Sequence, residues 1–194
     1  MKTFRALAAV LTLAAFAAPA MADRVNSPHD RLAGSDERDA NNSFFVEGGG
    51  PGLLYSVNYE RIVENDFGLR IGLSYTSLSA SAGSSSASAA FLTVPVIASY
   101  LGLRGGNHIL ELGAGATGIY ATGAGSISGA AASGSGMAVL GTAIIGYRRQ
   151  PVNGGFQFRI GLEALVGKGL ALSNPDPNAI CVLPWMYMSL GFSL

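Results

Sequence analysis

The residues best suited to chemistry in this chain are arginines and glutamates on segments that alternate between polar and apolar residues. They are Glu60, Arg70, Glu111, Arg148, Arg159 and Glu163. All but Glu163 lie within about four residues of a predicted turn, so we expect those five at one level of the fold, with Glu163 higher. Opposite charges enclosed at one level favour a paired ion network, because an unpaired buried charge is costly. Such groups can relay protons or solutes, but a structural role that fills an interior is the simpler interpretation.

Other motifs do not add up to a catalytic or metal site. The two histidines, His29 and His108, are far apart and have no evident partners for a zinc site or a Ser-His-acid triad. The glycine-rich run at 48–52 is not followed by the Lys-Ser/Thr pair of a phosphate loop. Cys181 is the single cysteine and has no partner for a disulfide. The sequence therefore predicts no catalytic residues, no metal, no cofactor and no enzyme activity.

The elements that carry the charged residues are short segments with a period of two, which is the period of a β-strand. In residues 67–76, Phe67, Leu69, Ile71, Leu73 and Tyr75 alternate with Gly, Arg, Ser and Thr. Residues 53–62, 108–120 and 156–165 repeat this pattern, and residues 43–48, 91–101, 137–148 and 185–194 follow it more weakly. We therefore expect about eight strands. Pro95, Ile97, Ile144, Trp185 and Tyr187 fit the alternation poorly.

The predicted connections alternate in length. Those at 63–66, 102–107 and 149–155 are short, whereas those at 79–90, 121–136 and 166–183 are long and mostly rich in Gly, Ala and Ser. The connection at 49–52 is short, although it lies at the same end of the strands as the long connections. Short turns on one rim and longer loops on the other are typical of a transmembrane barrel. The predicted fold class is all-β: a closed, antiparallel, up-and-down transmembrane β-barrel with short periplasmic turns and longer extracellular loops.

Composition and the start of the chain favour export into a membrane. Residues 1–22 have the basic start, short apolar run and Ala20-Met21-Ala22 end of a cleaved signal peptide. Residues 23–42 carry both charge signs and are predicted to be a flexible arm, which leaves the barrel to residues 43–194. Only 12% of residues are charged, and Lys168 is the single lysine after residue 22. No apolar run beyond residue 22 is long enough for a membrane helix, and no basic stripe indicates nucleic-acid binding.

The polar faces of the strands are mostly Gly, Ser and Thr, as expected for the crowded interior of a narrow barrel. The apolar faces carry no charge within the strands and end in aromatic residues, which predicts interface girdles. These girdle residues are Tyr59, Phe67, Tyr100, Tyr147, Phe156 and Phe192 on the turn side, and Tyr75 and Tyr120 toward the loops.

With these patterns, residues 43–194 resemble the small bacterial outer-membrane β-barrel proteins, the eight-stranded class of the OmpA and OmpX type. The resemblance is carried by residues 45–48, 54–61, 67–72, 108–115 and 146–148. It implies an outer-membrane location and a barrel fold rather than an activity. Barrels of this class end in an aromatic strand read by the assembly machinery. Phe192 fits that pattern, but the last residue is Leu194.

The sequence thus predicts a non-catalytic outer-membrane barrel with a structural or surface-interaction role and a lumen filled by side chains. The alternatives are a narrow channel for small solutes, a lipid-modifying barrel enzyme, and a soluble periplasmic or lipocalin-like barrel. The expected partners are outer-membrane lipid and, during biogenesis, the barrel-assembly machinery, with the protein a monomer.

Overall fold

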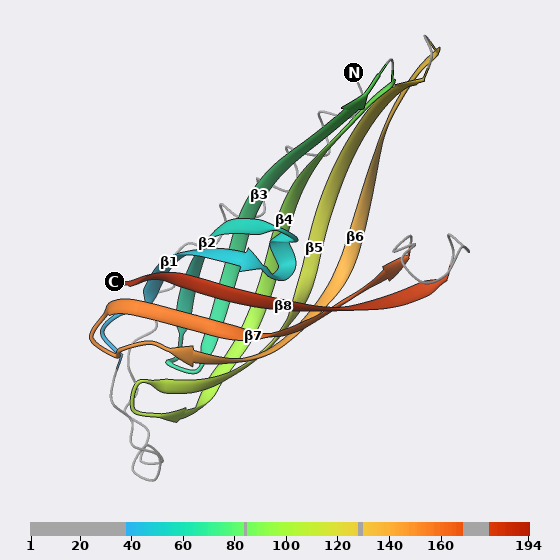
Figure 1. Ribbon diagram of the computed structural model, residues 1–194. Coiled ribbons are helices and arrows are strands. Elements are labelled where there is room, and N and C mark those ends of the chain that lie inside the picture. Colours follow the sequence, from blue (N-terminus) through green and yellow to red (C-terminus); the bar gives the residue numbers. More distant parts are fainter. Residues whose placement is uncertain (1–37, 84, 128–129, 169–178) are drawn as a thin grey trace, which may run out of the picture. The chain divides into compact units, whose positions relative to one another are not determined.

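A computed structural model describes residues 38–83, 85–127, 130–168 and 179–194. Eight strands pair in sequence order, and β1 also pairs with β8, so the sheet closes into an antiparallel up-and-down barrel (Figure 1). The predicted fold class is confirmed in its strand number, pairing and closure. The predicted signal peptide and residues 23–37 of the predicted arm lie outside the described residues. Among the described residues, no helix is long and apolar enough to cross a membrane.

The strands differ strongly in length. Their bounds are β1 (Asn42–Gly49), β2 (Tyr55–Val63), β3 (Phe67–Ala82), β4 (Ser85–Gly105), β5 (His108–Ile127), β6 (Ala130–Arg149), β7 (Gly155–Lys168) and β8 (Ile180–Ser193), with a 3-10 turn, η2 (Gly50–Gly52), between β1 and β2. The pairing of β3 with β2 begins at Leu73, and that of β6 with β7 begins at Gly141. The upper parts of β3–β6 therefore leave the ring and continue as a four-stranded sheet (Figure 1). We call this part the projecting sheet.

Alternation places the apolar side chains on the outside and the polar ones inside. On β2, Val57 is exposed while Asn58 and Glu60 are buried, and on β3 Leu69 and Leu73 are exposed. A soluble barrel has the opposite arrangement, because its apolar residues pack in the interior. The interior here is therefore a polar lumen filled by side chains.

Two of the predicted long loops are wrong. Residues 79–82 belong to β3 and 85–90 to β4, and the predicted loop at 121–136 is divided between β5 and β6. Every residue from Ser77 to Ala82 has a partner on β4, and the hairpin turns at Gly83, whose φ of 59° suits glycine. Ser, Ala and Gly have low strand propensity, so local sequence points to a loop, but continuous pairing with the neighbouring strands overrides that preference. The third predicted loop falls largely on residues 169–178, outside the described residues.

Pro95 is accommodated by a gap in the β3–β4 ladder. Pairing runs from Phe67↔Tyr100 to Ile71↔Val96 and resumes at Ser74↔Thr93, so Pro95 has no ladder partner on β3. Its other neighbour, Thr117 on β5, is in register. A proline lacks the N–H that a ladder needs on one side, which explains both the gap and its position.

The barrel begins earlier than the predicted boundary at residue 43. Strand β1 starts at Asn42, and the segment 38–41 before it is attached to the turn-side end of the barrel. The backbone N–H groups of Asp39 and Ala40 both donate to the carbonyl of Val152, at 3.1 Å. The last residues of the predicted flexible arm are therefore part of the barrel.

Candidate functional sites: the lumen and the projecting sheet

The centre of the lumen holds a cluster of fully buried charges around Glu60. The guanidinium groups of Arg148 and Arg159 both donate to Glu60 Oε2, that of Arg159 at 2.5 Å. Glu111 Oε1 lies 3.5 Å from Arg159 Nη1 and 3.9 Å from Arg148 Nη1. It also accepts a hydrogen bond from Ser99 Oγ at 2.9 Å. Four strands, β2, β5, β6 and β7, thus contribute charges to one cluster.

A second ion pair continues this cluster across the lumen. Arg70 Nη1 donates to Glu47 Oε2 at 2.8 Å, and both side chains are fully buried. The ring of Phe45 lies near both groups: the guanidinium carbons of Arg159 and Arg70 lie 4.0 and 5.7 Å from its centroid. A guanidinium this close to a ring face gains cation–π attraction. Phe45 was missing from the predicted site because it reads as an apolar exception on a polar face.

The structure brings five of the predicted charged residues into the lumen, in the two groups just described. Glu47 also joins, as the partner of Arg70. Glu163 faces the lumen and is buried, but its carboxylate forms no ion pair within the described residues, and neither oxygen has a hydrogen-bond partner. The paired charges thus form a compact network, and Glu163 stands apart from it. We call this set, Glu47, Glu60, Arg70, Glu111, Arg148 and Arg159, the ion network.

Two apolar layers enclose the ion network. Ile62, Leu101 and Ile109 form one cluster, and Ile97, Ile144 and Tyr187 form the other. Leu101, Ser99 and Ile97 follow one another along the lumenal face of β4, so Ser99, which donates to Glu111 of the network, lies between the layers. This explains three apolar residues that broke the predicted alternation: Ile97, Ile144 and Tyr187 pack together inside the barrel.

The turn-side mouth is closed by amide and hydroxyl groups. Gln150 Nε2 donates to Ser193 Oγ at 2.7 Å and to Ser43 Oγ at 3.1 Å. Ser193 Oγ in turn donates to Gln157 Oε1 at 3.1 Å. All four side chains are fully buried. This cluster joins β1, β7, β8 and the end of β6 across the lumen.

Arg38 adds a buried charge at the same mouth. It is 3% exposed, and its three guanidinium nitrogens have no hydrogen-bond partner among the residues that the structure describes. Burial and the nearby positive charges of Arg148 and Arg104 lower the pKa of Arg38 to about 10. The guanidinium remains charged at neutral pH, so the mouth carries positive charge toward the ion network.

The opposite end of the lumen is covered by η2, whose three residues are buried. Thr93 Oγ1 donates to the Gly52 carbonyl at 3.3 Å, and Trp185 Nε1 donates to the Leu53 carbonyl at 3.0 Å. Thr93 is on β4 and Trp185 is on β8, so the turn is held from opposite sides of the ring. The predicted short connection at 49–52 is therefore an inward plug, and Trp185 is explained as its anchor.

The turn-side aromatic residues form ring pairs around the outside of the barrel. The pairs are Phe44–Tyr59, Phe67–Tyr100, His108–Tyr147 and Phe156–Phe192, with centroids 5.1 to 6.1 Å apart. Each pair joins two consecutive strands: β1 with β2, β3 with β4, β5 with β6, and β7 with β8. All six predicted turn-side girdle residues are members, and sequence reasoning missed Phe44 and His108 as their partners. We call these four pairs the turn-side girdle.

The outer face of β3–β6 changes character at one row of cross-strand partners. The last apolar row is Tyr75, Leu92, Tyr120 and Met137, and it contains both predicted loop-side girdle residues. The next outward row is Ser77, Ala90, Thr122 and Ser135, followed by Ser79, Ser88, Ala124 and Ser133. On β6 the apolar stretch from Tyr147 to Met137 spans roughly 34 Å along the strand, or about 26 Å at a 40° tilt. Membrane barrels have apolar bands of about 25 Å.

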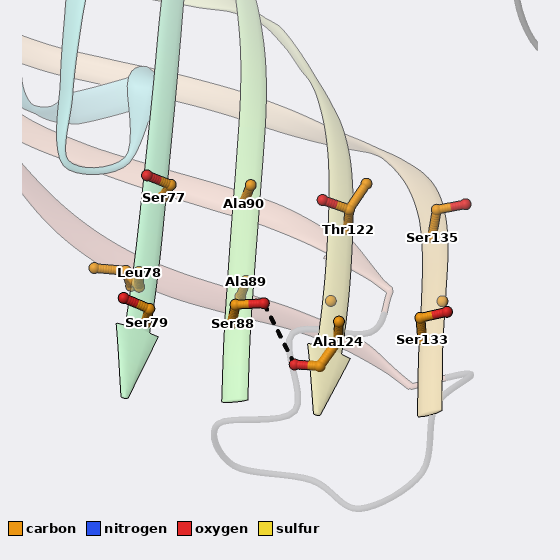
Figure 2. A pocket seen from close by; sticks show the side chains of 12 residues that line it. Ser77, Leu78, Ser79, Ser88, Ala89, Ala90, Thr122, Ala124, Ser133 and Ser135 are labelled. Atoms are coloured by element: carbon orange, nitrogen blue, oxygen red, sulfur yellow. Dashed lines mark hydrogen bonds between the residues drawn. The ribbon is translucent and has the colours of Figure 1, made fainter. Parts of the chain in front are cut away.

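Above that row, the outer face of the projecting sheet is a shallow, uncharged, hydroxyl-lined surface. Figure 2 shows Ser77, Ser79, Ser88, Thr122, Ser133 and Ser135 on it. A depression of about 650 Å³ lies over these rows, and Ser88 Oγ donates to the Ala124 carbonyl at 3.5 Å. No aspartate, glutamate, lysine or arginine occurs between residues 71 and 103 or between 112 and 147.

The inner face of the projecting sheet is apolar, so the polarity of the barrel is inverted there. One inner row consists of Leu78, Ala89, Gly123 and Gly134, and the row below it includes Phe91. Leu78 is 56% exposed. Inside the barrel the same strand faces carry Arg70, Ser99, Glu111 and Arg148. The switch on both faces therefore occurs at about the same height of the sheet.

The comparisons with known proteins concern the fold. No family model matches the sequence, and no curated protein matches it. Among solved structures, the chain is similar to Ail, the attachment invasion locus protein of Yersinia pestis, at 16% identity and a TM-score of 0.47, over 79% of this chain and 97% of that one. It is similar to the N-terminal β-barrel domain of Pseudomonas aeruginosa OprF at 13% identity and a TM-score of 0.48, over 80% of this chain and 96% of that one. It is also similar to Acinetobacter baumannii CarO2, at 13% identity and a TM-score of 0.35, over 80% of this chain and 98% of that one.

At these identities the comparisons bear on fold alone, and the strand pairing of this chain defines the fold by itself. The chain is an eight-stranded, closed, antiparallel β-barrel. The resemblance to small eight-stranded barrels is confirmed at that level.

Proposed function

We propose that this chain is an integral bacterial outer-membrane protein, in which the barrel is a non-catalytic anchor and the projecting sheet contacts partners at the cell surface. The observation that carries the proposal is the switch from apolar to hydroxylated side chains at the row Tyr75, Leu92, Tyr120 and Met137. An apolar outer surface this large is costly in water but favourable against acyl chains. The apolar outer surface ends at the same row on four neighbouring strands, as expected at the edge of a hydrocarbon layer.

The lumen supports an anchor rather than a channel. Barrels of eight strands have interiors just wide enough for side chains. Here the ion network, two apolar layers, the amide–hydroxyl cluster and η2 follow one another along the lumen. The side chains of Glu60, Glu111, Arg148 and Arg159 have no exposed surface. We therefore expect negligible conductance.

The test uses the expressed full chain. The protein should stay in the membrane pellet after an alkaline carbonate wash, and it should migrate faster on a detergent gel before boiling than after. Release into the supernatant, as expected of a soluble periplasmic barrel, would reject the proposal. Single-channel recording in planar bilayers addresses the competing interpretation of a narrow channel: a reproducible open state of sizeable conductance would favour it. Unchanged lipid A by mass spectrometry after overexpression is expected of a non-catalytic barrel, and a modified lipid A would favour the lipid-modifying enzyme.

A further inference from the structure

The turn-side girdle contains the same three-residue arrangement twice. On β2, Tyr59 is followed two residues later by Arg61, and on β6 Tyr147 is followed two residues later by Arg149. Each arginine faces a polar residue on the neighbouring strand: Asn42 pairs with Arg61, and His108 pairs with Arg149. All of these residues are on the outward side of the barrel. We call the sets Asn42–Tyr59–Arg61 and His108–Tyr147–Arg149 the two rim clamps.

In both rim clamps the tyrosine hydroxyl bonds the residue that faces the arginine. Tyr59 Oη donates to Asn42 Oδ1 at 2.8 Å, and Tyr147 Oη lies 2.6 Å from His108 Nδ1. The first bond orients the amide so that the Nδ2 group remains a donor. In neutral His108, a Tyr147 hydroxyl that donates to Nδ1 leaves the ring proton on Nε2. The imidazolium form also carries a proton on Nε2, so this nitrogen is a donor in both forms. Each clamp therefore places an oriented N–H donor on the strand position opposite an arginine.

This donor set suits a tetrahedral oxyanion. A guanidinium offers paired N–H groups that match phosphate oxygens, and a neighbouring N–H adds a further bond. Arg61 and Arg149 are exposed, and neither forms an ion pair within the part of the chain that the structure describes. Arg104, on the same rim, is different: its Nη1 lies 3.2 Å from Asp66 Oδ1 and donates to the Asn65 carbonyl at 2.7 Å.

The position of the rim clamps on the barrel indicates which kind of phosphate compound they can reach. Their tyrosine rings belong to the girdle that ends the apolar band, and each arginine lies roughly 7 Å further along its strand. That is the headgroup level of the leaflet on the turn side. The clamps face sideways, toward lipid, and they sit on β1/β2 and β5/β6, on opposite sides of the ring.

We propose that each rim clamp binds the phosphodiester of a phospholipid in the leaflet that faces the turns. The inference rests on the proposed membrane location. The arginine and the Asn42 or His108 donor bind the phosphate oxygens, while the girdle rings contact the glycerol and upper acyl region. Two lipids held on opposite sides fix the height and tilt of the barrel in the membrane.

The experiment is native mass spectrometry of the full-length protein, purified in dodecyl maltoside, which contains no phosphate. Titration with short-chain phosphatidylglycerol should give two retained lipids per protein. Arg61→Gln or Arg149→Gln should each leave one, because affinity at the altered clamp falls about tenfold or more with the loss of a charge-assisted pair. The double variant should retain none. Arg104→Gln is the matched control and should still retain two.

A second variant separates phosphate binding from ring contact. His108→Phe keeps an aromatic ring against Tyr147 but removes both ring nitrogens, so it should weaken the second clamp several-fold and leave the first unchanged. Equal retention of lipid by the Arg61→Gln/Arg149→Gln double variant and the parent would overturn the proposal, as would equal retention of a diacylglycerol of the same chain length.

Inorganic phosphate distinguishes the source of the anion. Millimolar phosphate should not displace the retained lipids, because the acyl chains add contacts that free phosphate lacks. Displacement of both lipids by phosphate would assign the clamps to free phosphate and overturn the lipid assignment. The change in gel mobility on heating is recorded for the parent protein and for every variant. If the parent shows no such change, the result counts against the proposed membrane barrel. If the parent shows the change but retains no lipid, the result counts against the rim clamps alone.

Discussion

Glu60 bonds the guanidinium groups of both Arg148 and Arg159, which makes it the residue on which the ion network most depends. Removing one partner of a buried ion pair leaves an uncompensated charge, which costs more than the pair itself contributes. We expect Glu60→Gln to lower the free energy of unfolding by roughly 3–5 kcal/mol. Urea titration in detergent micelles, followed by the gel-mobility shift, measures this change.

Glu163 is the matched control for that experiment. It is also a buried lumenal glutamate, but its carboxylate has no ion-pair partner within the described residues. Glu163→Gln keeps the volume and removes a carboxyl group that is costly to bury in its charged form. It should leave stability unchanged or increase it. A loss as large as that of Glu60→Gln would show that the ion pairs are not what distinguishes the two positions.

Gly72 is required by the proline on the neighbouring strand. A Cβ at Gly72 would come within 2.8 Å of Pro95 Cγ and would also clash with the Asn58 side chain. Gly72→Ala should therefore destabilise the barrel by about 1–3 kcal/mol through overpacking. Gly118→Ala is the control, because its Cβ would meet only the Val94 carbonyl, at 3.8 Å. Equal unfolding midpoints for the two variants would contradict this explanation.

At the scale of the elements, the proposed membrane boundary crosses β3 within four residues. Leu73 and Ser77 are both on the outer face, on either side of the Tyr75 row. In a Cys181→Ser background, Ser77→Cys should react with a membrane-impermeant maleimide, whereas Leu73→Cys should be protected by acyl chains. The measurement is the mass shift of protein reconstituted in vesicles with the projecting sheet outward. Equal labelling of the two cysteines would place the boundary elsewhere.

The strands of the projecting sheet also show where prediction from local sequence stops. The alternation in residues 67–76 predicts the lower part of β3 correctly, because each outward position is apolar. From Ser79 to Ala82, Ser and Ala alternate with little difference in polarity, so the period of two carries little signal. Only the partners on β4 show that these residues are strand rather than loop.

At the scale of the whole molecule, the lumen is closed by layers in series. Thr93→Val with Trp185→Phe removes the side-chain hydrogen bonds to the carbonyls of Gly52 and Leu53 and should free η2. The ion network and both apolar layers remain beneath it, so we expect no sizeable conductance from this variant in planar bilayers. A stable open state would mean that η2 alone closes the lumen, and it would strengthen the channel interpretation.

The sequence by itself determined the strand number, the faces of most strands and most of the charges that enter the lumen. These follow from the period of two, which is a local property of each segment. The tertiary structure decided which charges pair, that Phe45 lies near two guanidinium groups, and that Glu163 stands apart. It also decided that residues 79–82, 85–90, 121–127 and 130–136 extend the sheet. These depend on the register between strands and on closure of the ring, which bring together residues as distant as Glu60 and Arg159.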